Sequence, residues 1–249
     1  GTEQIYIRNL ATGEDQQVTS LQGAAVSPAW SPDGSTLAFH DQNGATFIVD
    51  IGTGNVRQVI GPLFAPGRPT WSGDGSTVVF AALKPYTHRF REGTSQILTV
   101  NINNGTFAYT EPAPFKSFST RGDDGPVISP DGSFMAAVME DVLWIIPVDA
   151  TGHPTASAQQ INHEVTDAVS WSGDSQHLLY LSNGSLRLIS RDGSSVSTVP
   201  VDLVWRQEKH SGRTLIHAGR LWDGRGPQVL TNVDVVVINN RIDRIQPHS

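Results

Sequence analysis

A turn-and-strand motif recurs four times along this chain of 249 residues, and no other sequence feature limits the possible fold as strongly. Each copy sets a Ser-Pro-Asp-Gly or similar tetrapeptide ahead of a short apolar segment. The aligned aspartates are Asp33, Asp74, Asp131 and Asp174, spaced 41, 57 and 43 residues apart. A period of about 40 residues with four strands per unit is typical of a β-propeller. The sequence therefore predicts an all-β fold.

The chemistry of the motif supports this prediction. Proline presets one backbone dihedral angle, aspartate can hydrogen-bond to its own backbone, and glycine accepts a positive φ. The first expected strands of the units contain residues 37–39, 78–80 and 178–180, and later strands contain 46–49, 97–100, 142–148 and 186–189. Segments this short, with turns between them, leave no room for helices of ordinary length.

The copies are not identical. The third has Ile128 where the others have tryptophan, and the fourth has Ser175 in place of glycine. Residues 4–14 match only the second half of a unit, so we expect four full four-stranded blades and a half blade. The absent strands would lie upstream in a parent protein or be supplied by a later segment. The second unit carries extra residues at 84–93 and around 111–121, which we expect to decorate one face.

Composition excludes several functions. The net charge of −7 disfavours a wide phosphate-binding surface, so no nucleic acid is expected. The densest basic stretch, residues 88–91, reads as a solvated hairpin tip. The sequence contains no run of 18 apolar residues, so no membrane-spanning helix is predicted. The first residues do not have the pattern of a signal peptide, and an export signal that has been cleaved off stays open. The chain has no cysteine, which removes disulfides and thiolate chemistry.

Taken as a set, the four copies resemble the TolB-type propeller repeat, in which a Trp-Ser-Pro-Asp-Gly hairpin precedes an Ile-Tyr-Val-like strand. The resemblance covers residues 4–201. It implies a TolB-like β-propeller in the periplasm or outside the cell, with the cytoplasm left open as the alternative. It also implies a propeller face that binds a protein or peptide-like ligand, or that mediates assembly, including homo-oligomer formation.

The last residues follow a different pattern. Residues 214–224, Thr-Leu-Ile-His-Ala-Gly-Arg-Leu-Trp-Asp-Gly, and the strand-like residues 232–245 resemble the entry strands of a metal-dependent amidohydrolase of the imidazolonepropionase and prolidase-like kind. In that family such strands build part of a β-sandwich beside a barrel that binds a divalent, zinc-like metal. We therefore divide the chain into a propeller segment, 1–202, and an incomplete β-sandwich segment, 203–249.

No catalytic, cofactor-binding or metal-binding residue is predicted in this chain. The family's metal-binding His-x-His pair is absent, since no two histidines are separated by one residue. The histidines are His40, His88, His153, His163, His177, His210, His217 and His248. A metal is expected only in a barrel domain outside the sequence. Nor does the chain contain a G-x-S-x-G or a G-x-x-x-x-G-K motif.

Four sequence features could be taken for ligand-binding or recognition sites, but each is expected to have a structural role. The repeated aspartates lack the D-x-D-x-D-G spacing of calcium loops and are expected to stabilise turns. Trp30, Trp71 and Trp171 occupy equivalent positions and are expected to pack between blades. His217 is expected to be a packed or edge histidine. The tripeptide at residues 121–123, Arg-Gly-Asp, is expected to be a plain loop.

Three functional hypotheses follow. In the first, the chain is the non-catalytic part of a larger metal-dependent hydrolase of amide or peptide-like bonds. In the second, it is a free-standing binding module, a five-bladed propeller closed by pairing of residues 203–218 with residues 4–19. The echo of residues 34–38 in residues 212–216 supports this closure. The third, a propeller of the prolyl oligopeptidase type, is disfavoured by the Leu-Trp-Asp-Gly and Arg-Ile segments.

Overall fold

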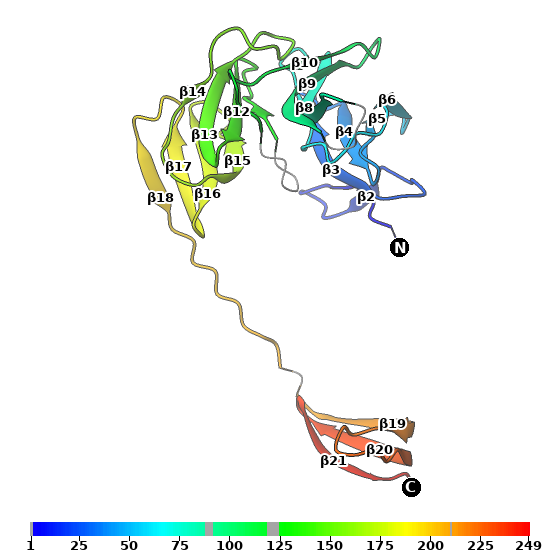
Figure 1. Ribbon diagram of the computed structural model, residues 1–249. Helices are drawn as coiled ribbons and strands as arrows, with labels where there is room; N and C mark the ends of the chain where they lie inside the picture. Colours follow the sequence, from blue (N-terminus) through cyan, green and yellow to red (C-terminus); the bar gives the residue numbers. More distant parts are fainter. Residues whose placement is uncertain (1, 88–91, 119–124, 210) are drawn as a thin grey trace. The chain divides into compact units, whose positions relative to one another are not determined.

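The computed structural model describes residues 2–87, 92–118, 125–209 and 211–249. Within these ranges every regular element is a strand, and all strand pairs are antiparallel, which confirms the all-β prediction. The chain divides into two compact units, Gly1–Pro200 and Val201–Ser249 (Figure 1). Basic residues 88–91, His210 and the tripeptide 121–123 lie outside the described residues.

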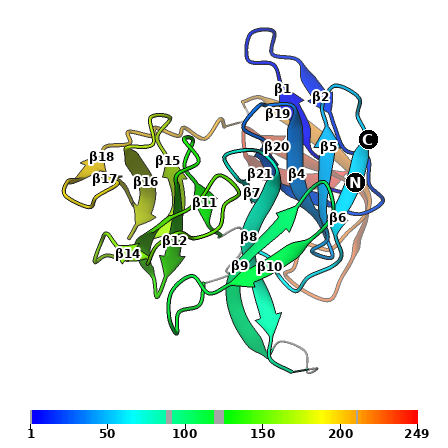
Figure 2. The same cartoon turned by 90° about the horizontal axis from the view of Figure 1, so that it is seen from above.

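The first unit contains four four-stranded sheets and one two-stranded sheet. Figure 2 shows the four-stranded sheets following one another in sequence order. The half unit forms β1 (Tyr6–Arg8) and β2 (Asp15–Gln17). The first blade comprises β3 (Ala25–Trp30), β4 (Thr36–Asp41), β5 (Thr46–Asp50) and β6 (Val56–Ile60). The second blade comprises β7 (Thr70–Trp71), β8 (Thr77–Pro85), β9 (Gly93–Asn101) and β10 (Phe107–Thr110).

The third blade comprises β11 (Val127–Ile128), β12 (Phe134–Met139), β13 (Val142–Pro147) and β14 (Gln159–Gln160). The fourth comprises β15 (Asp167–Trp171), β16 (His177–Ser182), β17 (Ser185–Ser190) and β18 (Val196–Val199). In each blade the repeated motif joins the first two strands, as the turn chemistry predicts. The extra residues of the second unit lengthen the β8–β9 hairpin, which pairs as far as Pro85 and Gly93.

The core lies between neighbouring blades. One cluster brings Ala38 of the first blade against Val78 and Phe80 of the second, and the latter two side chains are fully buried. The first strands of successive blades contact one another, β3 with β7, β7 with β11 and β11 with β15. Arg68, just before β7, donates from Nη2 to the main-chain oxygen of Val169 in β15, 2.5 Å away. The second and fourth blades are thereby joined directly.

The second unit is one three-stranded sheet in the order β19 (Arg213–Leu221), β20 (Leu230–Ile238), β21 (Arg241–Pro247). Within the described residues it has no second layer, so this part of the expected β-sandwich is a single sheet. The closure hypothesis needed residues 203–218 to pair with residues 4–19. Residues 213–218 instead pair with β20, because the valine-rich β20 supplies them with an apolar partner strand.

Candidate functional site

The repeated aspartates are held inside their own turns. In the first blade, Asp33 Oδ1 accepts hydrogen bonds from the hydroxyl of Ser31 (2.6 Å) and the N–H of Ser35 (3.1 Å). The hydroxyl of Ser31 in turn accepts from the N–H of Thr36, 3.0 Å away. These bonds, led by that of Ser31, lower the pKa of Asp33 to about 2. The same pattern surrounds the other three aspartates, which confirms their role as turn residues.

A further copy of this turn was missed in the sequence. Between β17 and β18, Asp192 Oδ1 accepts from the hydroxyl of Ser190 (2.6 Å) and the N–H of Ser194 (3.0 Å), and Ser195 N–H donates to the Ser190 hydroxyl (3.0 Å). The pKa of Asp192 is again lowered to about 2, chiefly by Ser190. The signal was present in Ser-Arg-Asp-Gly-Ser, which keeps the serine, aspartate and glycine but lacks the tryptophan.

The tryptophans of the motif connect blades where a preceding first strand exists. Trp71 Nε1 donates to the oxygen of Ala29 (3.0 Å), and Trp171 Nε1 donates to that of Val127 (2.9 Å). The prediction of interblade packing is wrong for Trp30, whose surface is 49% exposed. The half unit before it has only β1 and β2, so it offers no first strand to cover the indole.

The third copy compensates for its isoleucine in another way. Ile128 has no indole N–H, and its own main-chain N–H donates to the hydroxyl of Thr70, 3.2 Å away in the second blade. Thr70 holds the position that Ala29 holds in the first blade, directly before the tryptophan of the motif. A connection between first strands is therefore kept with different chemistry.

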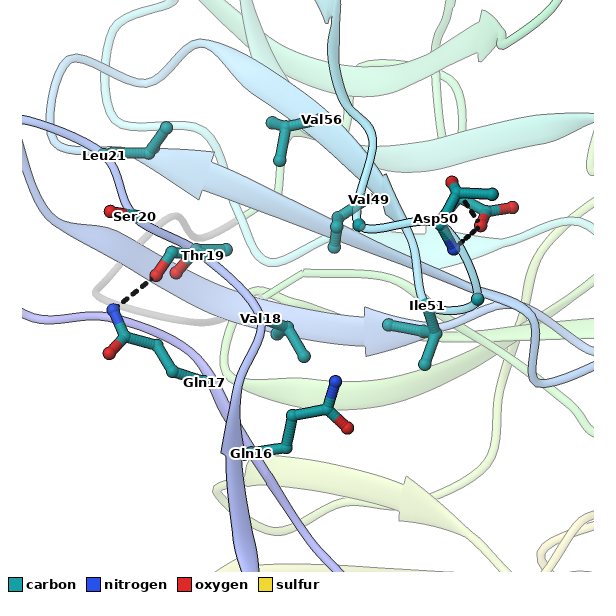
Figure 3. Close-up of a pocket in the computed structure, with 13 residues that line it drawn as sticks. Gln16, Gln17, Val18, Thr19, Ser20, Leu21, Val49, Asp50, Ile51 and Val56 are labelled. Carbon is teal, nitrogen blue, oxygen red and sulfur yellow. Dashed lines mark hydrogen bonds between the residues drawn. The ribbon is translucent and has the colours of Figure 1, made fainter.

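One concave feature of the first unit is a groove of about 690 Å³. One wall runs from Gln16 in β2 through the following segment to Leu21, and the other consists of residues 49–54 with Val56 (Figure 3). Asp50 is the one ionisable residue among those lining it, and its carboxylate already accepts from the N–H and hydroxyl of Thr53, both at 2.7 Å. Main-chain groups, amides, hydroxyls and aliphatic side chains make up the rest, so the groove suits a neutral ligand with hydrogen-bonding groups.

The side-chain amide of Gln16 has no hydrogen-bond partner in the part of the chain that the structure describes. Gln17, by contrast, donates to the oxygen of Thr19, 2.7 Å away, as Figure 3 shows. Gln16 thus offers a donor and an acceptor to a molecule in the groove.

The histidines fall into two groups. In the first unit, buried His40 lies 2.9 Å from the oxygen of Gly67, and His153 bonds to Thr99 and Thr151. In the second unit, His217 Nδ1 lies 3.2 Å and His248 Nδ1 lies 2.8 Å from Oδ1 of Asp234. The expectation of an edge histidine therefore describes the place of His217, and its carboxylate partner was not foreseen.

The sequence profile of the TolB beta propeller domain matches residues 1–205. This chain belongs to the TolB β-propeller family. No match was found among curated proteins.

Solved structures show the same fold. TolB from Acinetobacter baumannii is 15% identical, with a TM-score of 0.60 over 93% of this chain and 55% of that one. The dihydro-heme d1 dehydrogenase NirN in complex with DHE is 16% identical, with a TM-score of 0.57 over 100% of this chain and 62% of that one. Oligogalacturonate lyase from Vibrio parahaemolyticus is 16% identical, with a TM-score of 0.55 over 98% and 70%.

This TolB-family chain spans less than two thirds of the length of the first two structures. Identities of this size establish the fold alone, and the three proteins differ in what their names say they do. The shared feature is the propeller, a framework that carries unrelated functions. Across the described residues, no helix has the length and apolar character needed to cross a membrane.

Proposed function

We propose that this TolB-family propeller is a non-catalytic binding module that accepts a neutral, peptide-like segment in the groove between the β1–β2 sheet and the first blade. The observation that carries the proposal is the lining of this groove, in which the single carboxylate is occupied by Thr53. A peptide offers alternating donors, acceptors and aliphatic side chains, and the groove presents the same mixture. A phosphate or a strongly anionic ligand would find no lysine or arginine there.

A pair of equivalent valines provides the test. Val56 opens β6 and lines the groove, whereas Val196 opens β18 at the same place in the fourth blade, and their exposures are 40% and 43%. Fluorescence anisotropy would be measured against a panel of labelled peptides, one set uncharged and one charged. We expect uncharged peptides to bind, and Val56→Arg to weaken binding by at least about tenfold, or about 1.4 kcal/mol. Val196→Arg should leave binding unchanged.

Two results would contradict the proposal. Equal binding by the native chain and Val56→Arg would place the ligand elsewhere, and preferential binding of charged peptides would exclude the neutral groove as the site. Circular dichroism of both variants checks that the added arginine has not disturbed the blade.

The second candidate is the amidohydrolase hypothesis, in which the chain is the propeller region of a larger metal-dependent hydrolase. It is favoured by one observation: residues 214–246, which carry the resemblance, lie in a sheet that belongs to a unit of its own. The neighbouring side chains Leu215 and Ile216 are 55% and 50% exposed and point to opposite faces of the strand. Strands belonging to a larger sandwich would cover such faces.

The natural protein tests this second candidate. A natural mass greater by the several hundred residues of a barrel, together with metal-dependent hydrolysis of an amide, would support it. A natural mass of 26.9 kDa, that of this chain, would exclude it. A location in the periplasm or outside the cell forms part of both candidates, and cell fractionation tests it. Light scattering tests the expected homo-oligomer.

A further inference from the structure

Three ligand-type side chains meet on one face of the β19–β21 sheet: one from β19, one from β20, and one from the residue that directly follows β21. His217 in β19 stands directly opposite Asp234 in β20, and Asp234 stands opposite Gln246 in β21. His248 follows two residues after Gln246, so it lies on the same face as Asp234. The main-chain N–H of His248 donates to the oxygen of Asn232 (3.0 Å), which continues the pairing to this residue. Strand register therefore brings the three together.

Asp234 is the buried member of the group. It lies in the central strand between Val233 and Val235, and only 2% of its surface is exposed. An ionised carboxylate in such a place is unfavourable unless it is paired. Both imidazoles lie within hydrogen-bond distance of its Oδ1 atom, and no other side-chain partner is found for it among the described residues. The two histidines are therefore the side chains that pair with this buried carboxylate.

The distances suit a metal ion. A tetrahedral ion with bonds of about 2.0–2.1 Å to nitrogen and oxygen has ligand atoms about 3.3 Å apart. The Nδ1 atoms of His217 and His248 lie 3.2 Å and 2.8 Å from Asp234 Oδ1, and the ring centroids are 4.0 Å apart. One ligand atom from each residue can be chosen so that all lie within 4.8 Å of one another. Small rotations of the rings would place an ion between them.

The solvent exposure of the two histidines and the types of ligand atom also favour a metal ion. The side chains of His217 and His248 are 47% and 45% exposed, so an ion can enter from solvent while the carboxylate anchors it from below. Two imidazoles and one carboxylate suit zinc and its transition-metal neighbours, whereas magnesium and calcium take oxygen ligands. We propose that His217, Asp234 and His248 bind one zinc-like divalent metal ion in the second unit, with a fourth position open to water or to an outside ligand. This reverses the expectation of no metal ligand within the chain, and it is independent of the groove in the first unit.

Isothermal titration of the chelator-treated chain with zinc chloride tests this proposal. We expect one ion per chain, and His217→Gln or His248→Gln should each weaken binding by at least about 100-fold, because even residues that only support a metal ligand affect affinity by about 10–100-fold. His177→Gln, which changes an exposed histidine of β16, is the matched control and should bind as the native chain does. Cobalt(II) supplies a second readout, since its visible absorption reports ligands in a tetrahedral site.

Asp234→Asn serves as a third variant, and circular dichroism shows whether the sheet survives the change. The two glutamine variants replace half-exposed side chains, so they are expected to keep the fold even if the asparagine variant does not. The proposal is overturned if no ion binds, since the group is then only a hydrogen-bonded trio. It is equally overturned if one ion binds and neither glutamine variant weakens it, because the ion then lies elsewhere.

Discussion

The indole nitrogen of Trp71 donates a hydrogen bond to the main-chain oxygen of Ala29, 3.0 Å away, and so joins the first strands of two neighbouring blades. Trp71 is 5% exposed, and its counterpart Trp171 makes the equivalent bond to Val127. Trp30 holds the same position in the motif and is half exposed. The repeat thus places tryptophan in a buried environment at Trp71 and in an exposed one at Trp30. Substituting each in turn distinguishes the contribution of interblade packing to stability from that of the turn.

Trp71→Phe should lower the free energy of unfolding by about 1–3 kcal/mol, because it removes the indole donor to Ala29 and leaves a partly buried carbonyl without that partner. Trp30→Phe should change it by less than about 0.5 kcal/mol, since an exposed ring loses little. Urea denaturation measures both. Equal effects would show that the hydrogen bond between blades contributes nothing measurable.

The turns of the second and third blades approach so closely that a side chain is excluded. A Cβ atom added to Gly73 would lie 2.8 Å from the Cα of Gly132, whereas one added to Gly173, the same position in the fourth blade, would meet nothing within 4 Å. Neither Gly73 nor Gly173 has a positive φ, so the comparison is purely steric. We expect Gly73→Ala to destabilise by about 1–3 kcal/mol.

Gly173→Ala is the control for this comparison. It should be neutral or stabilise the chain by about 0.4–1 kcal/mol, because alanine reduces the freedom of the unfolded chain. Chemical denaturation of the two variants, side by side, gives the difference. Destabilisation by Gly173→Ala of the same size would mean that the turn itself, and not the neighbouring blade, rejects a side chain.

The serine that replaces glycine in the fourth copy forms a hydrogen bond with the turn of the neighbouring third blade. Ser175 has a φ of +60° and is 1% exposed, and its hydroxyl accepts a hydrogen bond from the N–H of Asp131, 3.0 Å away. Ser175→Ala keeps the unfavourable φ and loses the bond, so it should cost about 1–3 kcal/mol. Ser175→Gly loses the same bond but relieves the strain, worth about 1 kcal/mol, and should cost less.

Thermal unfolding ranks the native chain and these two variants. If alanine and glycine are equally destabilising, the left-handed conformation stores no strain at this position. If both match the native chain, the hydroxyl of Ser175 does not support the turn of Asp131.

Local sequence signals were sufficient for the blades, because each turn determines its hairpin without help from distant residues. The hydrogen bonds that fix the first turn lie within residues 31–36, and β5 begins at Thr46, where the sequence predicted. The exposure of Trp30 could not be predicted in this way, since it depends on whether the preceding unit supplies a first strand to cover the indole. A tryptophan motif identifies the position and says nothing about whether a neighbouring strand exists.

The histidine–aspartate group could not be predicted from local sequence for a related reason. His217, Asp234 and His248 are 17 and 14 residues apart, and only the register of three strands unites them. One signal was available: Asp234 interrupts a run of valines, and a charged residue in a central strand needs a partner. The identity of that partner requires the pairing of β19 with β20 and of β20 with β21.

The turn aspartates should make the propeller less stable in acid. Asp33 and Asp192 have a pKa of about 2 in the folded chain against an ordinary value of 3.8, because serine hydroxyls and main-chain N–H groups bind the ionised form. A pKa lowered by folding gives stability that is fully present above about pH 4 and is lost as the pH falls towards about 2. The melting temperature of the native chain should therefore decline across this interval.

The double variant Asp33→Asn with Asp192→Asn keeps an acceptor oxygen in each turn but cannot titrate, so its melting temperature should decline less steeply. Parallel curves for the two proteins would show that these carboxylates do not contribute to the acid sensitivity.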